Sequence, residues 1–231
     1  MPPVSPRSDL GAGDAPHDAA LDPALQRAVL SLSSPAVLVG ARAILSGDEL
    51  ALLPGEANSI AAKLAHARRA SGAARIVARG LMAKFGIAEC PIVKSSSGAP
   101  IWPSGILGSL AHDDAVAVAA VARSMDASAI GIDVEPAEPL PRELHELALS
   151  RRERAHVSGD PVAGRLMFAA KEAVYKALAA FDGTLLDYHD IETEIAAGRA
   201  RIADGRCLAL RYSRVPRVIV LAIMDRLRPL R

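Results

Sequence analysis

The stretch Ala129-Ile130-Gly131-Ile132-Asp133-Val134-Glu135-Pro136 is an apolar run that ends in two carboxylates two positions apart. In an extended strand, residues i and i+2 point to the same face, so Asp133 and Glu135 would project together while the aliphatic residues between them face the other way. Two carboxylates at a strand end suit Mg²⁺ or Mn²⁺, which take oxygen ligands, keep water molecules and complete their shell with substrate phosphate. An acidic strand end entering the proline-rich loop 136–141 is the alternative, because Asp-x-Glu alone is a weak pattern.

A second stretch, Phe168-Ala169-Ala170-Lys171-Glu172-Ala173-Val174-Tyr175-Lys176-Ala177-Leu178, predicts a helix, since it is rich in alanine and straight-chain residues and has no internal glycine or proline. Glu172 and Lys176 are four positions apart and share a helix face. They form either a surface ion pair of little energetic weight or a third carboxylate ligand with a phosphate-binding ammonium one turn away. The pattern leaves both interpretations open.

The composition limits the function classes. The 231 residues, 51% of them hydrophobic, can bury a substantial core in one domain or two small ones. Lys and Arg number 27 against 26 Asp and Glu, a net charge of +1, and aromatic residues make up 3%. Both values argue against a nucleic-acid binder, which needs positive charge and aromatic stacking surfaces. We therefore expect any phosphate chemistry to be local.

The two cysteines and the composition of residues 1–22 favour a location in the reducing cytoplasm. Cys90 and Cys207 are far apart and lack a second cysteine at metal-ligand spacing, so neither zinc nor a disulfide framework is indicated. Residues 1–22 are rich in Pro, Ala, Gly and Asp and lack the architecture of a signal peptide, and no apolar run is long enough to span a bilayer. We expect a cytoplasmic protein whose residues 1–22 form a disordered tail.

The expected elements alternate along the chain in a way that predicts an α+β fold of two halves, residues 23–122 and 123–231, with a ligand cleft between them. Helices are predicted at 23–32, at 56–85 as either two helical segments or one helix kinked at Ser71-Gly72, with a C-cap at Gly86, at 142–149 and at 150–157. Ser150 and Glu153 would form a capping box on the last of these. The other predicted strands are 36–45, 115–121, the hairpin 191–195 with 200–202, 207–212 and 217–224.

Several basic residues are candidates for contacts with an anion. Arg68, Arg75 and Arg79 are seven and four positions apart, which puts them on one helical face. That face is either solvated or turned toward an anionic ligand, for which arginine supplies two donors at once. His112, just before a predicted strand, is either a hydrogen-bonded turn residue or, when protonated, a donor to phosphate.

The ordered set of motifs resembles one family, the 4′-phosphopantetheinyl transferases, in the siderophore-synthesis type of about this length. The resemblance covers residues 68–178 and rests on Trp102-Pro103, Gly108-Ser109-Leu110-Ala111-His112, Gly131-Ile132-Asp133-Val134-Glu135 and Phe168-Ala169-Ala170-Lys171-Glu172-Ala173-Val174-Tyr175-Lys176. It implies two pseudo-symmetric α+β halves with coenzyme A bound in the cleft. It also implies transfer of the 4′-phosphopantetheine arm to a serine of an apo acyl, aryl or peptidyl carrier domain, with release of adenosine 3′,5′-bisphosphate.

The resemblance also implies residue roles. Asp133, Glu135 and Glu172 would be the Mg²⁺ ligands, Lys176 would hold the phosphate under attack, and Glu172 would accept the serine proton directly or through water. The 3′-phosphate of coenzyme A would be held by His112, Lys94, Arg75 and, with weaker support, Arg68. The carriers would belong to fatty-acid, polyketide or nonribosomal peptide synthases, and the enzyme would act as a monomer.

Two departures from the family pattern lead to further expectations. Ala111 stands where the family usually has Ser or Thr, so a phosphate hydrogen bond would be lost or supplied instead by Ser109 or a backbone amide. The turn Ser97-Gly98-Ala99 lacks the basic residue often found there, so coenzyme affinity would be lower. The alternative function is a non-catalytic module that binds coenzyme A or a carrier domain, although the complete carboxylate set argues against it. An apolar segment at 144–149 beside Arg151, Arg152 and Arg154 is the predicted docking face for an acidic carrier helix.

Overall fold

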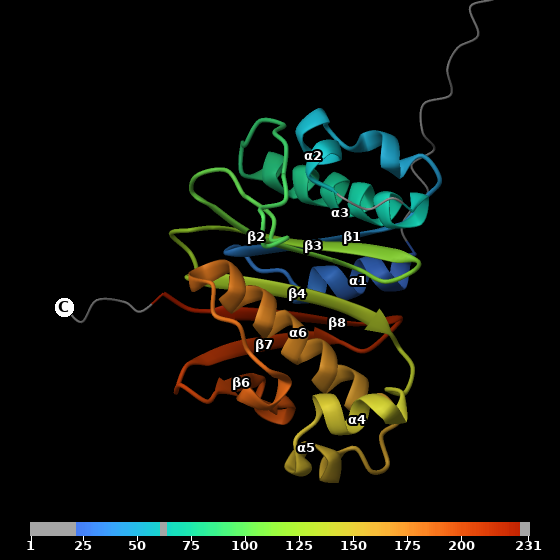
Figure 1. Cartoon of the computed structure of the whole chain (residues 1–231), viewed down its shortest axis with the longest axis vertical. Helices are drawn as coiled ribbons and strands as arrows, with labels where there is room; N and C mark the ends of the chain where they lie inside the picture. Colours follow the sequence, from blue (N-terminus) through green and yellow to red (C-terminus); the bar gives the residue numbers. More distant parts are fainter. Residues whose placement is uncertain (1–21, 61–63, 227–231) are drawn as a thin grey trace, which may run out of the picture.

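Two antiparallel sheets lie face to face in the computed structural model, which describes residues 22–60 and 64–226 (Figure 1). The first sheet has the order β1 (Val37–Ala43), β3 (Val116–Arg123), β2 (Ile106–His112). The second has the order β4 (Ala129–Pro136), β8 (Arg217–Met224), β7 (Cys207–Ser213), β6 (Arg199–Ile202), β5 (Ile191–Glu194). The predicted tail, apart from Asp22, lies outside the described residues.

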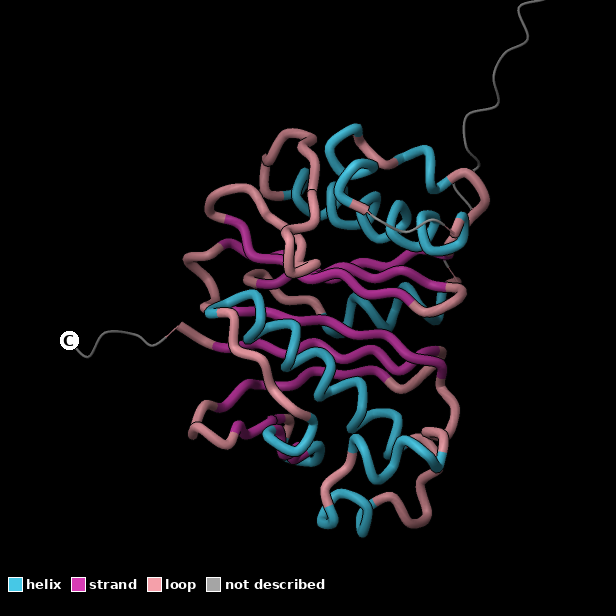
Figure 2. The backbone as a smooth tube through the Cα atoms, viewed as in Figure 1, coloured by secondary structure: helices cyan, strands magenta, loops and turns pink. Residues whose placement is uncertain are grey.

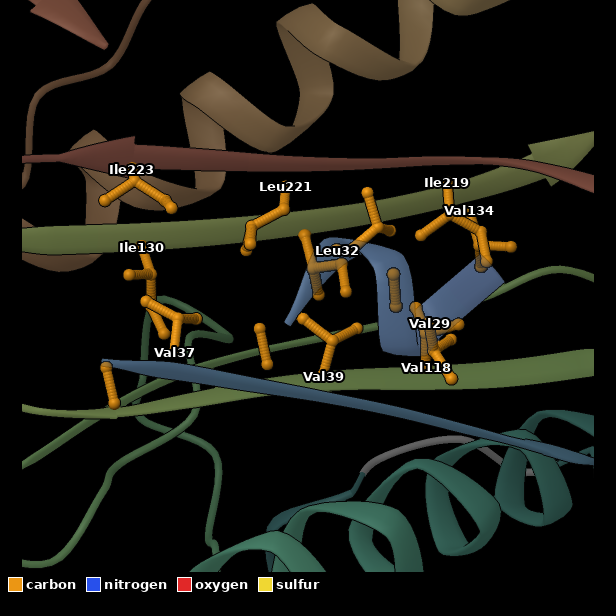
Figure 3. Packing of buried hydrophobic residues seen from close by; sticks show 14 of the residues in the cluster. Val29, Leu32, Val37, Val39, Val118, Ile130, Val134, Ile219, Leu221 and Ile223 are labelled. Atoms are coloured by element: carbon orange, nitrogen blue, oxygen red, sulfur yellow. The ribbon is translucent and has the colours of Figure 1, made fainter. Parts of the chain in front are cut away.

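Aliphatic side chains fill the space between the sheets. Val37, Val39 and Val118 of the first sheet face Ile130 and Leu221 of the second, and α1 (Pro23–Leu32) adds further apolar residues at one side (Figure 3). Strand β3 is buried along nearly its whole length because α3 covers its other face, which explains its continuous apolar sequence. The inter-sheet core therefore joins the two halves.

Each sheet carries one 20-residue helix on its outer face (Figure 1). Helix α3 (Ala65–Lys84) packs on the first sheet and α6 (Ala163–Asp182) on the second. The remaining helices are short: η1 (Asp48–Ala51), α2 (Pro54–Ser59), α4 (Arg142–Ala148), α5 (Arg151–His156), η2 (Tyr188–Asp190) and η3 (Ile195–Ala197). The predicted α+β class and its two halves are confirmed, while the boundary at residue 122 stays a prediction.

The predicted kink at Ser71-Gly72 is wrong, because α3 runs through both residues. A Cβ at Gly72 would lie 1.9 Å from the carbonyl oxygen of Asp48, so the glycine serves the close approach of η1 rather than a bend. Helix α2 ends at Ser59, and residues 61–63 lie outside the described residues. The predicted cap is confirmed: Gly86 has φ +76°, its amide donates to Ala83 and the next amide donates to Met82, as in a Schellman motif.

Two further features position the functional side chains. Helix α5 begins with the predicted capping box between Ser150 and Glu153. The segment 85–105 between α3 and β2 contains no helix or strand apart from an isolated bridge between Lys94 and Pro100 (Figure 2). Within residues 22–60 and 64–226, none of the helices has the length and hydropathy needed to span a bilayer.

Candidate active site

The close contact between β4 and α6 brings the acidic strand end and the basic helix residue together. Gly131 permits it, because a Cβ there would lie 1.9 Å from the carbonyl oxygen of Ala173. As a result Lys176 Nζ lies 2.6 Å from Asp133 Oδ1 and also donates to the carbonyl of Ile132 at 3.3 Å. Lys176 thus pairs across to the strand, so the interpretation of Lys176 as a surface partner of Glu172 is wrong.

Three carboxylates lie on this side of β4 and α6, and each has a different partner. Arg165 Nη1 donates to Glu135 Oε2 at 2.8 Å. The hydroxyl of Tyr188 donates to Glu172 Oε1 at 2.5 Å. Among the residues that the structure describes, no three His, Cys, Asp or Glu side chains are arranged to hold a metal ion. Each of the three carboxylates is therefore held by its own donor.

The electrostatics of the group suit a cation. Burial raises the pKa of Asp133 to about 6, with Lys176 acting against the shift and Glu135 and Glu172 adding to it. Burial also raises the pKa of Glu135, against the effect of Arg165. Asp133 Oδ2 is buried and has no hydrogen-bond partner. The chemistry of three hard oxygen donors, one with an open buried oxygen, suits Mg²⁺ or Mn²⁺, but the side chains would have to rearrange, with Arg165 and Tyr188 giving up oxygens, to hold the ion.

A cavity of about 400 Å³ lies beside this group, lined by α3, residues 94–100, β2 and α6, and so by both halves. Four of the predicted site residues line it: Arg75, Lys94, His112 and Lys176. Arg68 is absent from its lining, and its Nη1 lies 3.5 Å and 3.4 Å from the carbonyl oxygens of Ala57 and Ile60. The cavity thus has a basic wall, and one of its residues, Lys176, pairs with Asp133 of the carboxylate group.

Two arginines of α3, Arg75 and Arg79, are not solvated. Arg75 is 2% exposed and Arg79 has a side chain 10% exposed, and both pair with Glu56, which is fully buried. The interpretation of a solvated basic face is therefore wrong for these two. His112 is an exposed residue at the end of β2, and partial desolvation of its ring lowers its pKa, with Lys176 and Lys94 adding to the shift and Asp113 opposing it. It is neutral at pH 7, and a phosphate beside it would favour protonation.

The structure changes the expectation about Ala111. Its side chain packs in the inter-sheet core with Val118 rather than lining the cavity. Ser109 does line the cavity, but its hydroxyl oxygen accepts the amide of Ile132 at 3.1 Å. The Ala111 side chain therefore has no direct route to a ligand in the cavity.

The predicted docking segment is only partly exposed. Leu149 is fully buried, and Leu147 is the large apolar residue of 144–149 that is exposed, at 56%. Leu147 lines a second cavity of about 410 Å³ together with Glu172, Tyr175 and Tyr188. Arg151 and Arg152 are exposed, whereas Arg154 donates to the carbonyl of Leu149 at 2.7 Å. The exposed part of this region therefore adjoins Glu172.

Three residues that hold the site together were not among those predicted from the sequence: Arg165, Tyr188 and Glu56. Arg165 and Tyr188 hold Glu135 and Glu172 from positions 30 and 16 residues away. No spacing pattern links such pairs, because each contact depends on how α6 and the chain after it cross β4. Tyr188 also packs against Phe168, with ring centroids 5.6 Å apart.

Comparison with known proteins identifies the family. The model of the 4′-phosphopantetheinyl transferase N-terminal domain matches residues 55–122, and that of the 4′-phosphopantetheinyl transferase superfamily matches residues 129–215. The chain is 36% identical over 176 residues to 4′-phosphopantetheinyl transferase Npt of Nocardia iowensis, covering 74% of this chain and 79% of that protein.

Two other relatives match over shorter regions. 4′-Phosphopantetheinyl transferase Svp of Streptomyces mobaraensis is 34% identical over 150 residues, 62% of this chain and 61% of that protein. PptT of Mycobacterium tuberculosis is 36% identical over 129 residues, 54% of this chain and 57% of that protein. The match thus spans less than two thirds of these two relatives, but most of the Nocardia protein. With both family models matching in the expected order, the chain belongs to the 4′-phosphopantetheinyl transferase family.

Proposed function

We propose that this protein transfers the 4′-phosphopantetheine arm of coenzyme A to a serine hydroxyl of an apo carrier protein and releases adenosine 3′,5′-bisphosphate. The observation that carries the proposal is a cavity lined by both halves whose basic wall includes Lys176, which in turn pairs with Asp133 of the adjoining carboxylate group. A polyanionic coenzyme matches the basic wall, and a divalent cation matches the carboxylates. The family uses coenzyme A and typically Mg²⁺.

Asp133, Glu135 and Glu172 would hold Mg²⁺ or Mn²⁺. The bound ion supplies neutralisation of charge on the pyrophosphate oxygens. Without it, three carboxylates would repel the coenzyme at the place where its phosphates must lie. Lys176, whose Nζ now donates to Asp133, would turn toward the phosphate under attack and stabilise its charge.

In the reaction the serine oxygen forms a bond to the phosphorus next to the pantetheine, and the bond from that phosphorus to the bridging oxygen breaks. The leaving group departs with the electron pair as adenosine 3′,5′-bisphosphate. Glu172 would accept the serine proton, directly or through water, on the carboxylate oxygen that does not bind the metal. Tyr188, whose hydroxyl donates to Glu172 Oε1, would orient the carboxylate before a metal takes that oxygen.

Arg75, Lys94 and His112 would hold the 3′-phosphate of the coenzyme at the basic wall. Arg68 keeps only the support of the family resemblance, because it lies outside the cavity lining. The serine would approach from the second cavity, which Leu147, Glu172 and Tyr188 line. Tyr175 lines both this cavity and the one proposed for the coenzyme.

The partners would be acyl, aryl or peptidyl carrier domains of fatty-acid, polyketide or nonribosomal peptide synthases. A relative from Salmonella typhi, 30% identical over 113 residues, is called enterobactin synthase component D, which favours a role in siderophore or other secondary metabolism. We expect this protein to act as a cytoplasmic monomer.

Intact-mass analysis of an apo carrier incubated with the protein, coenzyme A and Mg²⁺, beside an EDTA control, tests the proposal. A metal-dependent gain of one phosphopantetheine unit supports it. Glu172→Gln is expected to abolish transfer while the circular dichroism spectrum stays unchanged, and robust transfer by the folded variant would refute the role given to Glu172. Coenzyme binding without transfer to any of several carriers would favour the non-catalytic binding module.

A further inference from the structure

A fully buried carboxylate, Glu56 of α2, holds the coenzyme side of the candidate site without lining the cavity. Its oxygens accept the backbone amides of Leu53 and Ile92, each at 2.8 Å, and Arg79 Nη1 at 2.9 and 3.0 Å. Arg75 Nε lies 3.7 Å away. One carboxylate thus joins α2, α3 and the segment that leads to Lys94.

Arg75 is fixed in an arrangement that leaves one donor group open. Its Nε donates to the carbonyl of Ile92 at 2.8 Å and its Nη1 to that of Ser71 at 3.2 Å. Its Nη2 is buried and has no hydrogen-bond partner, although the residue lines the cavity. A buried guanidinium nitrogen without a partner is costly unless a ligand or water completes it. The open nitrogen therefore indicates an acceptor in the cavity.

We infer that Glu56 is a positioning residue for coenzyme binding, which holds Arg75 so that Nη2 meets a coenzyme phosphate; this inference rests on the proposed function. Burial lowers the pKa of Arg75, the Glu56 carboxylate opposes that shift, and Arg79 adds to it. Without the carboxylate, two buried guanidiniums would repel each other. The same helix supports Lys94, whose amide donates to Ser59 Oγ at 3.0 Å.

The sign of one mutational effect tests the inference. Coulomb's law alone predicts that Glu56→Gln strengthens anion binding, because a negative charge is removed near Arg75. A positioning role predicts weaker anion binding, because the amide nitrogen of glutamine would face N–H groups whose hydrogen bonds Glu56 now accepts. We expect the variant to bind coenzyme A about 10- to 100-fold more weakly, as for loss of a hydrogen bond to a charged group. The kcat for transfer should change little.

The experiment is calorimetric titration of the full chain with coenzyme A and with 3′-dephospho-coenzyme A. Glu56→Gln should lose affinity for coenzyme A and much of the preference for it over the dephospho form. Asp48→Asn is the matched control, because Asp48 is also buried, at 5% exposure, and pairs with Arg42 at 2.8 Å, while neither lines the cavity. It should keep wild-type affinity for both.

A double-mutant cycle separates positioning from a general loss of structure. In an Arg75→Ala background, Glu56→Gln should have little further effect on coenzyme affinity. If Glu56→Gln does not fold, Glu56→Asp, which keeps the charge but shortens the reach to Arg75, should show the same loss. Unchanged or tighter coenzyme binding by the folded variant, or no binding by the wild type, would overturn the inference. Failure of transfer with intact binding would count against the proposed function alone.

Discussion

Gly131→Ala should separate α6 from β4 and thereby disassemble the candidate active site. A Cβ at this position would lie 1.9 Å from the carbonyl oxygen of Ala173 and 2.8 Å from the amide nitrogen of Ala177. Both are backbone atoms of a helix packed on a sheet, so no side-chain rotation relieves the overlap. The helix itself must move.

The size of the movement follows from the same contact. An ordinary contact begins near 3.4 Å, so the carbonyl must retreat by about 1.5 Å from its position 1.9 Å away. If α6 moved as one body, the 2.6 Å contact between Lys176 and Asp133 would lengthen to about 4 Å, too long for a hydrogen bond. Overpacking of this kind costs about 1–3 kcal/mol of unfolding free energy. A misplacement of about 1 Å lowers the rate about 100-fold.

Two assays check this prediction: urea unfolding, and transfer to a carrier followed by intact mass. Gly80→Ala is the control, because Gly80 lies inside α3 and a Cβ added there would meet no atom of another element within 4 Å. It should raise the unfolding free energy by about 0.5–1 kcal/mol and leave transfer unchanged. A Gly131→Ala protein with wild-type transfer and stability would show that the close approach of α6 and β4 has no functional importance.

Three other predictions concern the charged residues. The pKa of Glu153 is lowered: burial alone would raise it, but hydrogen bonds from Lys171 and Thr193 outweigh that effect. The contribution of Glu153 to stability is therefore present above pH 4.5 and is lost as the pH falls through the lowered native pKa. Glu153→Gln should lower the unfolding free energy by about 3–5 kcal/mol at pH 7, because it leaves Lys171 buried without its partner. Urea unfolding of the variant from pH 7 to 3 should depend less on pH than that of the wild type, and an unchanged acid profile would contradict this. Asp133→Asn should weaken Mn²⁺ binding measured by electron paramagnetic resonance, and wild-type affinity would exclude Asp133 as a ligand. Joint charge reversal of Arg151 and Arg152 to glutamate should raise the KM for the carrier, whereas Arg27→Glu, on the exposed face of α1, should not. An unchanged carrier KM in the double variant would contradict the docking prediction.

Elements whose cause is local could be predicted from the sequence. The alternation of β4, the capping box at Ser150 and the cap at Gly86 each depend on residues a few positions apart. The error at Ser71-Gly72 had a tertiary cause. Glycine there is typical of a helix break, but it serves contact with the Asp48 carbonyl, 24 positions earlier in the chain. A close approach between distant segments leaves no periodic pattern in the sequence.

In the candidate site, too, features with a local cause could be predicted and contacts between distant segments could not. The shared face of Asp133 and Glu135 and the helix of Glu172 and Lys176 could be predicted, because strand and helix periodicity determine them. The partners of these residues could not, since Arg165 and Tyr188 reach them only after the chain has turned between elements. The arginines of α3 were placed on one face, yet their burial depends on Glu56, 23 positions before Arg79.

The missing partners give a reason why the carboxylates can lie together before a metal arrives. Glu135 and Glu172 add to the raised pKa of Asp133, Glu172 also adds to that of Glu135, and each of the three carboxylates is held by its own donor, Lys176, Arg165 or Tyr188. Those donors keep three negative charges in one place at limited cost, because each forms a hydrogen bond with the carboxylate it holds. Under the proposed function, a divalent cation that took over their oxygens would free the Lys176 ammonium for the substrate phosphate. The pairing seen between Lys176 and Asp133 is therefore compatible with both of their proposed roles, since one contact replaces the other.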